Sequence, residues 1–530
     1  MTPELFFKCI ALWWDPSYAS WIYFALFLPI VILVYNFTPE KERFRVLLLA
    51  SWFYFITLSG WLFLIHILEV IWTWQMGLAI QRLSDNKELK RKEKNKRKKK
   101  VLAVGILSLI AVLFVLKYLD FTGMNIVKLL TVFHISREWK MLNLAIPLGI
   151  SYYTLEAISY LTDVYREDIQ ADPSFSHVAL YMGFFPKIVE GPITRYGDDA
   201  KALFSGCPIT YENLTAGYQR IYLGVFKKLM IADHLAPAVD SVFKWNEKAG
   251  SIALFGAVIF TVQEYMDFSG AIDIVIGSAK IFGIDLAENF MQPFFAKNAS
   301  DFWHRWHITL GTFFRDYIFY PVSVSKPVMK LTKNIKNLFG KTISHFAGPT
   351  IAIFCVWISN GLWHGPKWNY IFYGMYYFVL IFIENIVEKP FLSLLEKIHL
   401  TEESISVRLF RFIKLTFIVL IGEMFFRAET MEDGFQMFRM IFIKYRPHKL
   451  VKHLGSFGLD QFDYWTVTIS FIIIVIYGVL KEYKYPLKER FAALPKPVRW
   501  TVWYLMIIAV VIFGAYGNGY DKAGMIYAKF

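Results

Sequence analysis

The feature that most constrains this sequence is a series of continuous apolar runs, several of them 17 or more residues long, such as Tyr464–Leu480 and Trp500–Tyr516. A helix of that length can cross a hydrocarbon core about 30 Å thick. The runs are continuous rather than alternating, as in helices that satisfy their own backbone hydrogen bonds inside lipid and unlike the strands of a membrane barrel. Only 19% of the residues are charged, against about a quarter in a soluble domain. The sequence therefore predicts an all-α, polytopic integral membrane protein.

The apolar stretches predict a single membrane domain with roughly eleven transmembrane helices, because no polar block as large as a soluble domain and no internal repeat separates them. The stretches fall near residues 21–36, 44–80, 101–119, 141–162, 174–190, 216–233, 251–284, 312–324, 346–363, 369–387, 406–426, 464–480 and 500–516. Within the domain 1–530 we distinguish N-terminal spans (1–140), a motif-bearing core (141–375), C-terminal spans (376–516) and a tail (517–530).

Positive charge is concentrated in short segments between the apolar runs. Residues 87–100 carry ten basic and two acidic side chains. The positive-inside rule places this segment, which we expect to be a loop, on the cytoplasmic side together with 326–341 and 481–499. The last span then delivers the tail 517–530 to the outer face, although basic segment 444–452 would also lie outside, which the rule disfavours. We expect 87–100 to contact anionic lipid rather than nucleic acid, because no nucleic-acid-binding signature accompanies it.

Two motifs carry most of the chemistry. Residues 298–320, NASDFWHRWHITLGTFFRDYIFY, place two histidines, two arginines and two aspartates in a largely aromatic setting. Ionisable residues at membrane depth are costly and are candidates for function. Residues 359–368, SNGLWHGPKW, close an apolar run at His364. A helix that rises about 1.5 Å per residue from Phe346 on the cytoplasmic side brings His364 to the middle or outer half of the bilayer. A neutral imidazole there can accept the proton of an attacking hydroxyl.

These motifs resemble the membrane-bound O-acyltransferase family, most closely the branch that O-acetylates bacterial envelope polysaccharides such as alginate and peptidoglycan. The resemblance rests on PLGISYYTLEAISYLTDVYR (147–166), FFPKIVEGPITRY (184–196), QEYMDFSGAIDIVIGSAKIFGIDLAENFMQPF (263–294), DFWHRWHITLGTFFRDYIFYP (301–321) and NGLWHGPKWNYIFYG (360–374). It implies a ring of helices and re-entrant segments around a central tunnel, in a bacterial cytoplasmic membrane. One departure is His304, where the family motif carries arginine or another polar residue.

The resemblance implies that His364 is the catalytic residue and that His307 is the second residue of the site. It implies acetyl-CoA as the acyl donor, with no permanently bound cofactor. His304 and His307 are expected to share a helix face, but no carboxylate or cysteine pair completes a zinc site at a suitable spacing, so we expect no metal.

Four further residues are candidates for contacting the acyl donor or the oxyanion of the intermediate: Arg305, Trp306, Arg315 and Asn360. For the two arginines the alternative is a buried charge network with Asp316.

Acidic side chains also lie within or beside the apolar segments, namely Glu156, Asp163, Glu264, Asp267 and Asp273. Polar contacts between helices are favoured for them over a proton relay. Gly191–Pro192 predicts a broken helix that lines a cavity rather than facing lipid, and around this pair lie Lys187, Glu190, Arg195 and Tyr196.

The C-terminal residues 526–530, IYAKF, resemble the aromatic ending of the polysaccharide-acetylating branch, and they make Tyr527 a candidate transient acyl carrier. CoA cannot cross a bilayer, whereas a hydroxyl reaching into a tunnel can take up the acyl group and carry it out. A phenol is a poor nucleophile until it loses its proton, with a pKa near ~10, so Tyr527 would need His364 as its base. The alternative is simple aromatic anchoring of the tail.

Taken together, motifs and resemblance predict a membrane O-acyltransferase that moves an acetyl group from cytoplasmic acetyl-CoA to an extracytoplasmic polysaccharide. The resemblance implies a secreted or membrane-anchored partner of the SGNH type that completes the transfer. Two alternatives stay open. One is a transporter or flippase for a lipid-linked or small substrate, since buried histidines and acids suit a proton-coupled carrier. The other is the same enzyme class with a different acceptor, a lipid or a D-alanylated teichoic acid.

Overall fold

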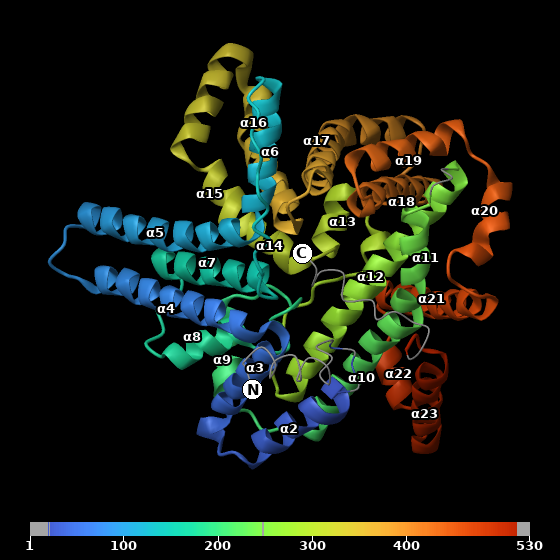
Figure 1. The fold of residues 1–530 in the computed structure, drawn as a ribbon, viewed down its shortest axis with the longest axis horizontal. Coiled ribbons are helices and arrows are strands. Elements are labelled where there is room, and N and C mark those ends of the chain that lie inside the picture. The colour runs from blue at the N-terminus through green and yellow to red at the C-terminus, as the bar shows by residue number, and fades with distance from the viewer. Residues whose placement is uncertain (1–17, 19, 21, 246–248, 517–530) are drawn as a thin grey trace.

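The structure, a computed structural model, describes residues 18, 20, 22–245 and 249–516 (Figure 1). Helices make up most of these residues, and no strand occurs among them. A single isolated bridge pairs Phe290 with Trp306. The all-α prediction is therefore confirmed for the described part of the chain.

The helices follow one another in three groups along the chain. The N-terminal group is α2 (Leu28–Phe37), α3 (Arg43–Ser59), α4 (Phe63–Asp85), α5 (Arg91–Lys117) and α6 (Leu119–Val132). The middle group is α7 (Ile150–Arg166), α8 (Phe175–Gly183), α9 (Tyr196–Ser205), α10 (Tyr211–Lys227), α11 (Asp233–Phe243), α12 (Gly250–Ile281), α13 (Ala299–Arg305), α14 (Ile308–Phe314) and α15 (Tyr320–Ser323). The C-terminal group is α16 (Lys326–His364), α17 (Trp368–Lys397), α18 (Ile405–Arg427), α19 (Met431–Ile443), α20 (Pro447–His453), α21 (Gln461–Glu482), α22 (Leu487–Ala492) and α23 (Lys496–Phe513).

Helices α4 and α5 form a long pair, and α7 packs against both of them (Figure 1). The basic segment 87–100, expected as a loop, is helical from Arg91 onward and begins α5. Lysine and arginine are good helix formers, so a run of them extends a following apolar helix. Lys98 fixes this end of α5 through an ion pair to Glu167 at 2.6 Å. The expectation of a loop was wrong for most of the segment.

Helix α12 crosses the middle of the molecule and packs against α10, α11, α18 and α19 (Figure 1). Its side chains are buried over almost its whole length, including the charged Glu264, Asp267 and Asp273. A helix that is apolar all round and carries paired charges is typical of a protein interior. The apolar stretch 251–284 is therefore an interior helix, enclosed by other helices.

Among the residues that the structure describes, five segments are long and apolar enough to cross a membrane: Glu40–Asp85, Arg91–Lys117, Ser344–His364, Gln461–Glu482 and Lys496–Phe513. On the last two, large apolar side chains such as Ile473 and Ile512 are about half exposed or more. Exposed apolar helix faces of this kind fit a lipid surround. The chain is thus a multi-pass membrane protein, and the number of about eleven spans stays a prediction.

The irregular stretch between α8 and α9 lies inside the protein. It follows Gly183 at the end of α8 and runs to the start of α9 at Tyr196, and its residues 184–194 are buried. The break around Gly191–Pro192 was expected from the sequence. Non-helical backbone at membrane depth is tolerated only where protein or an aqueous cavity surrounds it, so this stretch marks the interior of the fold.

Candidate active site

His307 lies in the short connection between α13 and α14. Its backbone adopts the left-handed conformation (φ 47°), which is uncommon for a residue other than glycine. The neighbouring segment pairs with this connection: Ile308 N–H donates to Asn289 O at 3.0 Å and Met291 N–H donates to Arg305 O at 2.9 Å. Such strained conformations persist only where surrounding contacts hold them, and they cluster at functional sites.

The side chain of His307 is oriented by Asn289. Its Nδ1 lies 3.2 Å from Asn289 Oδ1, which also accepts the backbone N–H of Thr309 at 3.1 Å and the Thr309 hydroxyl at 3.0 Å. Because a backbone N–H can only donate, this atom of the amide is its oxygen, and Nδ1 of His307 must be the donor. The neutral imidazole then keeps the lone pair on Nε2. His307 is only 2% exposed, and burial favours this neutral form.

His364 is the last residue of α16, and two side chains from the end of α5 cap that helix. Lys117 Nζ donates to Trp363 O at 2.9 Å, and Tyr118 OH donates to Leu362 O. The last carbonyls of a helix have no partner within the helix, so such donors stabilise its end. At the next position, Gly365 has φ 152°, and a Cβ there would lie 3.0 Å from the ring of Tyr370. The local sequence LWHG thus ends the helix at His364.

The two histidines meet at Trp363. The ring of Trp363 lies 5.5 Å from that of His307 and 5.1 Å from that of His364, centroid to centroid. Each histidine is 2% exposed, and they interact electrostatically with each other. Aromatic rings close the site, with Phe268 4.9 Å from His307 and Phe426 5.1 Å from His364. Two buried imidazoles in a water-poor setting suit proton transfer between a hydroxyl and a leaving group.

Asn360 lies one helical turn before His364 on α16 and therefore projects from the same face of the helix. It is 4% exposed, and among the described residues its Oδ1 has no hydrogen-bond partner. An amide group beside the base can donate to a developing oxyanion through its nitrogen.

The remaining candidates lie in other surroundings. Trp306 is buried in an aromatic group, its ring stacked on Phe302 at 5.6 Å. Arg305 forms ion pairs with Asp301 at 3.2 Å and Glu482 at 3.0 Å.

Arg315 is exposed and pairs with its neighbour Asp316 at 2.8 Å. Asp316 also forms an ion pair with Arg195. Arg305 thus pairs with acids other than Asp316, and Arg315 pairs with Asp316 at an exposed position rather than in a buried network. A contact of either arginine with the donor stays a prediction. Tyr527 lies outside the described residues.

His304 does not share a helix face with His307, contrary to expectation. Helix α13 ends at Arg305, and the left-handed backbone at His307 redirects the chain. His304 is exposed, and its Nδ1 contacts Ser300 O at 2.7 Å, whereas His307 is buried. In the described part of the chain, no three His, Cys, Asp or Glu side chains come together as a metal-ion site.

Sequence reasoning missed three residues of the site: Lys117, Asn289 and Thr309. Lys117 was visible only as a lysine that ends an apolar run, a position that the positive-inside rule explains equally well. Asn289 and Thr309 lie in segments that carry the family resemblance, but nothing in their spacing to His307 indicates a contact.

A cleft lies between α10, α12 and α21, and neither His307 nor His364 is among its lining residues. Its charged lining residues are Arg220, Lys227, Asp273, Glu288 and Lys481. Asp273 pairs with Arg220 at 2.5 Å and with Lys227 at 2.7 Å, and Glu288 pairs with Arg220 at 2.7 Å. These acids largely compensate the cations, so the cleft has little excess charge.

Comparisons with known proteins place these motifs in context. The sequence matches the model of the membrane-bound O-acyltransferase family over residues 99–427. It is 27% identical over 471 residues to the probable alginate O-acetylase AlgI of Azotobacter vinelandii, covering 89% of this chain and 86% of the relative. It is 28% identical over 372 residues to the peptidoglycan O-acetyltransferase of Helicobacter pylori, covering 64% of each chain. It is 32% identical over 295 residues to the teichoic acid D-alanyltransferase of Bacillus subtilis, covering 51% of this chain and 69% of the relative.

Proposed function

The chain belongs to the membrane-bound O-acyltransferase family, and from this premise we propose that it moves an acetyl group from cytoplasmic acetyl-CoA across the membrane to an extracytoplasmic polysaccharide. As a member of this family the protein is an O-acyltransferase, which replaces the transporter alternative. Acetyl as the group transferred and polysaccharide as the acceptor are supported by similarity to alginate O-acetylases and to a peptidoglycan O-acetyltransferase.

The observation that carries the proposal is that His307, from the α13–α14 connection, and His364, from the end of α16, meet at the ring of Trp363. In the proposed reaction the hydroxyl oxygen bonds to the acyl carbon of the thioester while His364 takes the hydroxyl proton. The C–S bond then breaks, and the proton passes to the leaving sulfur. Base assistance of this kind contributes roughly 10²–10⁴-fold. Asn360 donates to the oxyanion from the same helix face, and His307 supports His364.

The acceptor hydroxyl at the site is proposed to belong to Tyr527, which carries the acetyl group outward. Because CoA remains in the cytoplasm, the group needs a carrier or a tunnel to reach the outer face. A secreted or membrane-anchored partner of the SGNH type completes transfer to the polymer. The proposed location is the bacterial cytoplasmic membrane.

The test is transfer of label from acetyl-labelled acetyl-CoA to protein and polymer, in membranes that contain the partner and the polysaccharide. We compare the wild type with His364→Ala and Tyr527→Phe. His345→Ala is a matched control, since His345 is an exposed histidine of the same helix α16.

We expect His364→Ala to abolish labelling and His345→Ala to leave it intact. Loss of polymer labelling with Tyr527→Phe is expected if the tail carries the group. Equal labelling of wild type and His364→Ala would overturn the assignment of the base. Normal polymer labelling with Tyr527→Phe would remove the carrier role of the tail.

A second candidate is D-alanyl transfer to teichoic acid, favoured by the similarity to the Bacillus subtilis enzyme. It predicts the same dependence on His364 with a D-alanyl thioester as donor, and no labelling from acetyl-CoA. The two donors, supplied to the same membranes, separate the candidates.

A further inference from the structure

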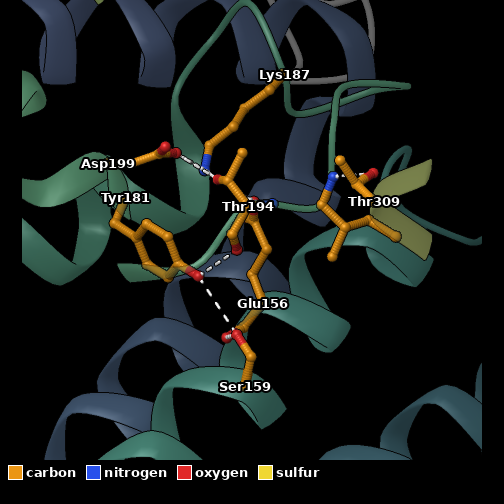
Figure 2. A network of polar contacts seen from close by, with 8 residues as sticks. Glu156, Ser159, Tyr181, Lys187, Thr194, Asp199 and Thr309 are labelled. Atoms are coloured by element: carbon orange, nitrogen blue, oxygen red, sulfur yellow. Dashed lines mark hydrogen bonds and ion pairs between the residues drawn. The ribbon is translucent and has the colours of Figure 1, made fainter. Parts of the chain in front are cut away.

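A buried charge cluster lies in the irregular segment between α8 and α9. Lys187 Nζ donates to Glu156 Oε1 at 2.8 Å, to Thr194 Oγ1 at 2.6 Å and to Asp199 Oδ2 at 3.2 Å (Figure 2). Each of these four residues is only 3% or 4% exposed. The ring of Tyr181 lies 4.4 Å from the ammonium. We call Glu156, Lys187, Thr194 and Asp199 the Lys187 cluster.

The Lys187 cluster is rigid for a physical reason. An ammonium has three protons to donate, and Lys187 uses three acceptors from α7, the irregular segment and α9. Breaking a buried ion pair is strongly unfavourable, because it leaves an uncompensated charge. The backbone between Lys187 and Asp199 is therefore held in place by contacts that cannot be exchanged for water.

A chain of hydrogen bonds runs from this segment to the active site. Beside Thr194, the backbone N–H of Ile193 donates to Thr309 Oγ1 at 3.0 Å, as Figure 2 shows. Because Thr309 Oγ1 accepts this bond, its own proton is free to point at Asn289 Oδ1, 3.0 Å away. Asn289 Oδ1 is the atom that accepts the Nδ1 proton of His307 at 3.2 Å.

We propose that the Lys187 cluster positions His307. Acting through Ile193, Thr309 and Asn289, it holds the imidazole as the tautomer with its proton on Nδ1 and its lone pair on Nε2. The cluster residues reach His307 only through these intervening groups in the described contacts, so they are positioning residues. The consequence for catalysis rests on the proposed function, whereas the tautomer itself does not.

The tautomer matters because a neutral imidazole can carry its proton on either nitrogen, and only the nitrogen without a proton can accept one. With the proton on Nδ1, His307 offers an acceptor at Nε2. If Asn289 were turned away, the proton could move to Nε2, and the acceptor would be lost. In such sites the group that orients a histidine decides which nitrogen is available.

The direct test is nitrogen NMR of the full-length protein labelled with ¹⁵N-histidine in lipid, since protonated and unprotonated ring nitrogens have distinct shifts. Subtracting the spectrum of His307→Gln assigns the signals of His307. We compare Thr309→Val, which removes the hydroxyl, with Thr309→Ser, which keeps it. Thr312→Val is the matched control, because the Thr312 hydroxyl donates only to Ile308 O of its own helix, at 2.9 Å.

We expect a single tautomer with protonated Nδ1 in the wild type, in Thr309→Ser and in Thr312→Val, and a mixture in Thr309→Val. A wild type with its proton on Nε2, or a Thr309→Val spectrum identical to the wild type, would overturn the proposal. The NMR result does not depend on acyl transfer, so it stands or fails separately from the proposed function.

Kinetics provide the second readout. We expect Thr309→Val to lower kcat roughly tenfold with KM unchanged, the factor that corresponds to about 1.4 kcal/mol for one lost hydrogen bond, and Thr309→Ser to restore it. The triple variant Glu156→Gln/Lys187→Met/Asp199→Asn removes the buried charges together and should lower kcat by a similar factor.

If the Lys187 cluster acts through Thr309, adding Thr309→Val to the triple variant causes no further loss. Independent, multiplying losses would refute this route. Should the triple variant fail to fold, the comparison of Thr309→Val with Thr309→Ser still decides the proposal.

Discussion

The crossing of α10 and α12 gives the sharpest prediction about packing. At Gly224 of α10, an added Cβ would lie 2.3 Å from Gly270 O of α12. At Gly217, about two turns earlier on α10, an added Cβ would lie 2.6 Å from Gly277 O. These contacts are with backbone atoms, which cannot turn aside as a side chain can. Small residues at such crossings let helix backbones approach closely.

The perturbation is Gly224→Ala. Alanine favours a helix over glycine by up to about 1 kcal/mol. Overpacking costs about 1–3 kcal/mol, and the upper end applies where backbone meets backbone. The net effect is a destabilisation of about 2 kcal/mol. The matched control is Gly478→Ala on α21, where an added Cβ meets no atom within 4 Å. There only the gain in helix propensity remains, so the free energies of unfolding of the two variants should differ by about 3 kcal/mol.

The assay is the fraction of purified protein that stays monodisperse in size-exclusion chromatography after heating, measured over a temperature series. We expect the midpoint of Gly224→Ala to fall below that of the wild type and the midpoint of Gly478→Ala to equal or exceed it. Acyl transfer should fall as well, because α12 also carries Phe268, which packs 4.9 Å from His307. A Gly224→Ala protein as stable as Gly478→Ala would refute the close crossing of α10 and α12.

Two further predictions concern Lys117 at the end of α5 and Asp120 in α6. Lys117→Met should lower acyl transfer roughly tenfold, because Trp363 O at the end of α16 loses a buried donor. Lys128→Met, at an exposed site of α6, is the control and should leave acyl transfer unchanged. Equal activities of the two variants in the label-transfer assay would contradict the capping role of Lys117. Hydrogen bonds from the Leu142 backbone N–H and the Trp139 indole lower the pKa of Asp120. The segment 139–143 should therefore stay protected from hydrogen exchange until the pH falls below the ordinary aspartate pKa of about 3.9. The variant Asp120→Ala should lose that protection already at neutral pH. Protection that fades well above pH 4 in the wild type, after correction for intrinsic exchange, would count against this anchor.

The sequence predicted the helical class because apolar runs report directly on helices that bury their own hydrogen bonds. It did not distinguish a helix surrounded by lipid from one surrounded by protein, since both are apolar all round. Helix α12 is the example: two of its acids are paired with lysines of α10 and the following turn, Asp273 with Lys227 at 2.7 Å and Asp267 with Lys228 at 2.8 Å. The composition of 251–284 alone gives no sign of these partners.

For the candidate site, the two motif histidines were singled out from local sequence, and the structure brings both to Trp363. Their supporting residues were not singled out, because they come from distant segments. Asn289 and Lys117 reach the site only through tertiary packing, and no spacing rule links them to His307 or His364. The expected helical register of His304 and His307 failed for a related reason: one left-handed residue, held by its neighbours, overrides the helix period.

Both histidines lie at helix ends, and these ends depend on other parts of the protein. In a membrane interior no water compensates an exposed carbonyl or amide, so a reactive side chain can lie at a helix end only if other parts of the protein satisfy the freed backbone groups. At His364, Lys117 and Tyr118 supply the donors; at His307, Asn289 and the segment around Ile193 hold the irregular chain. Polar groups from parts of the chain distant in sequence therefore allow the helix ends to exist there. It follows that variants which neutralise these distant groups should impair acyl transfer before they disturb the apolar helices that face lipid.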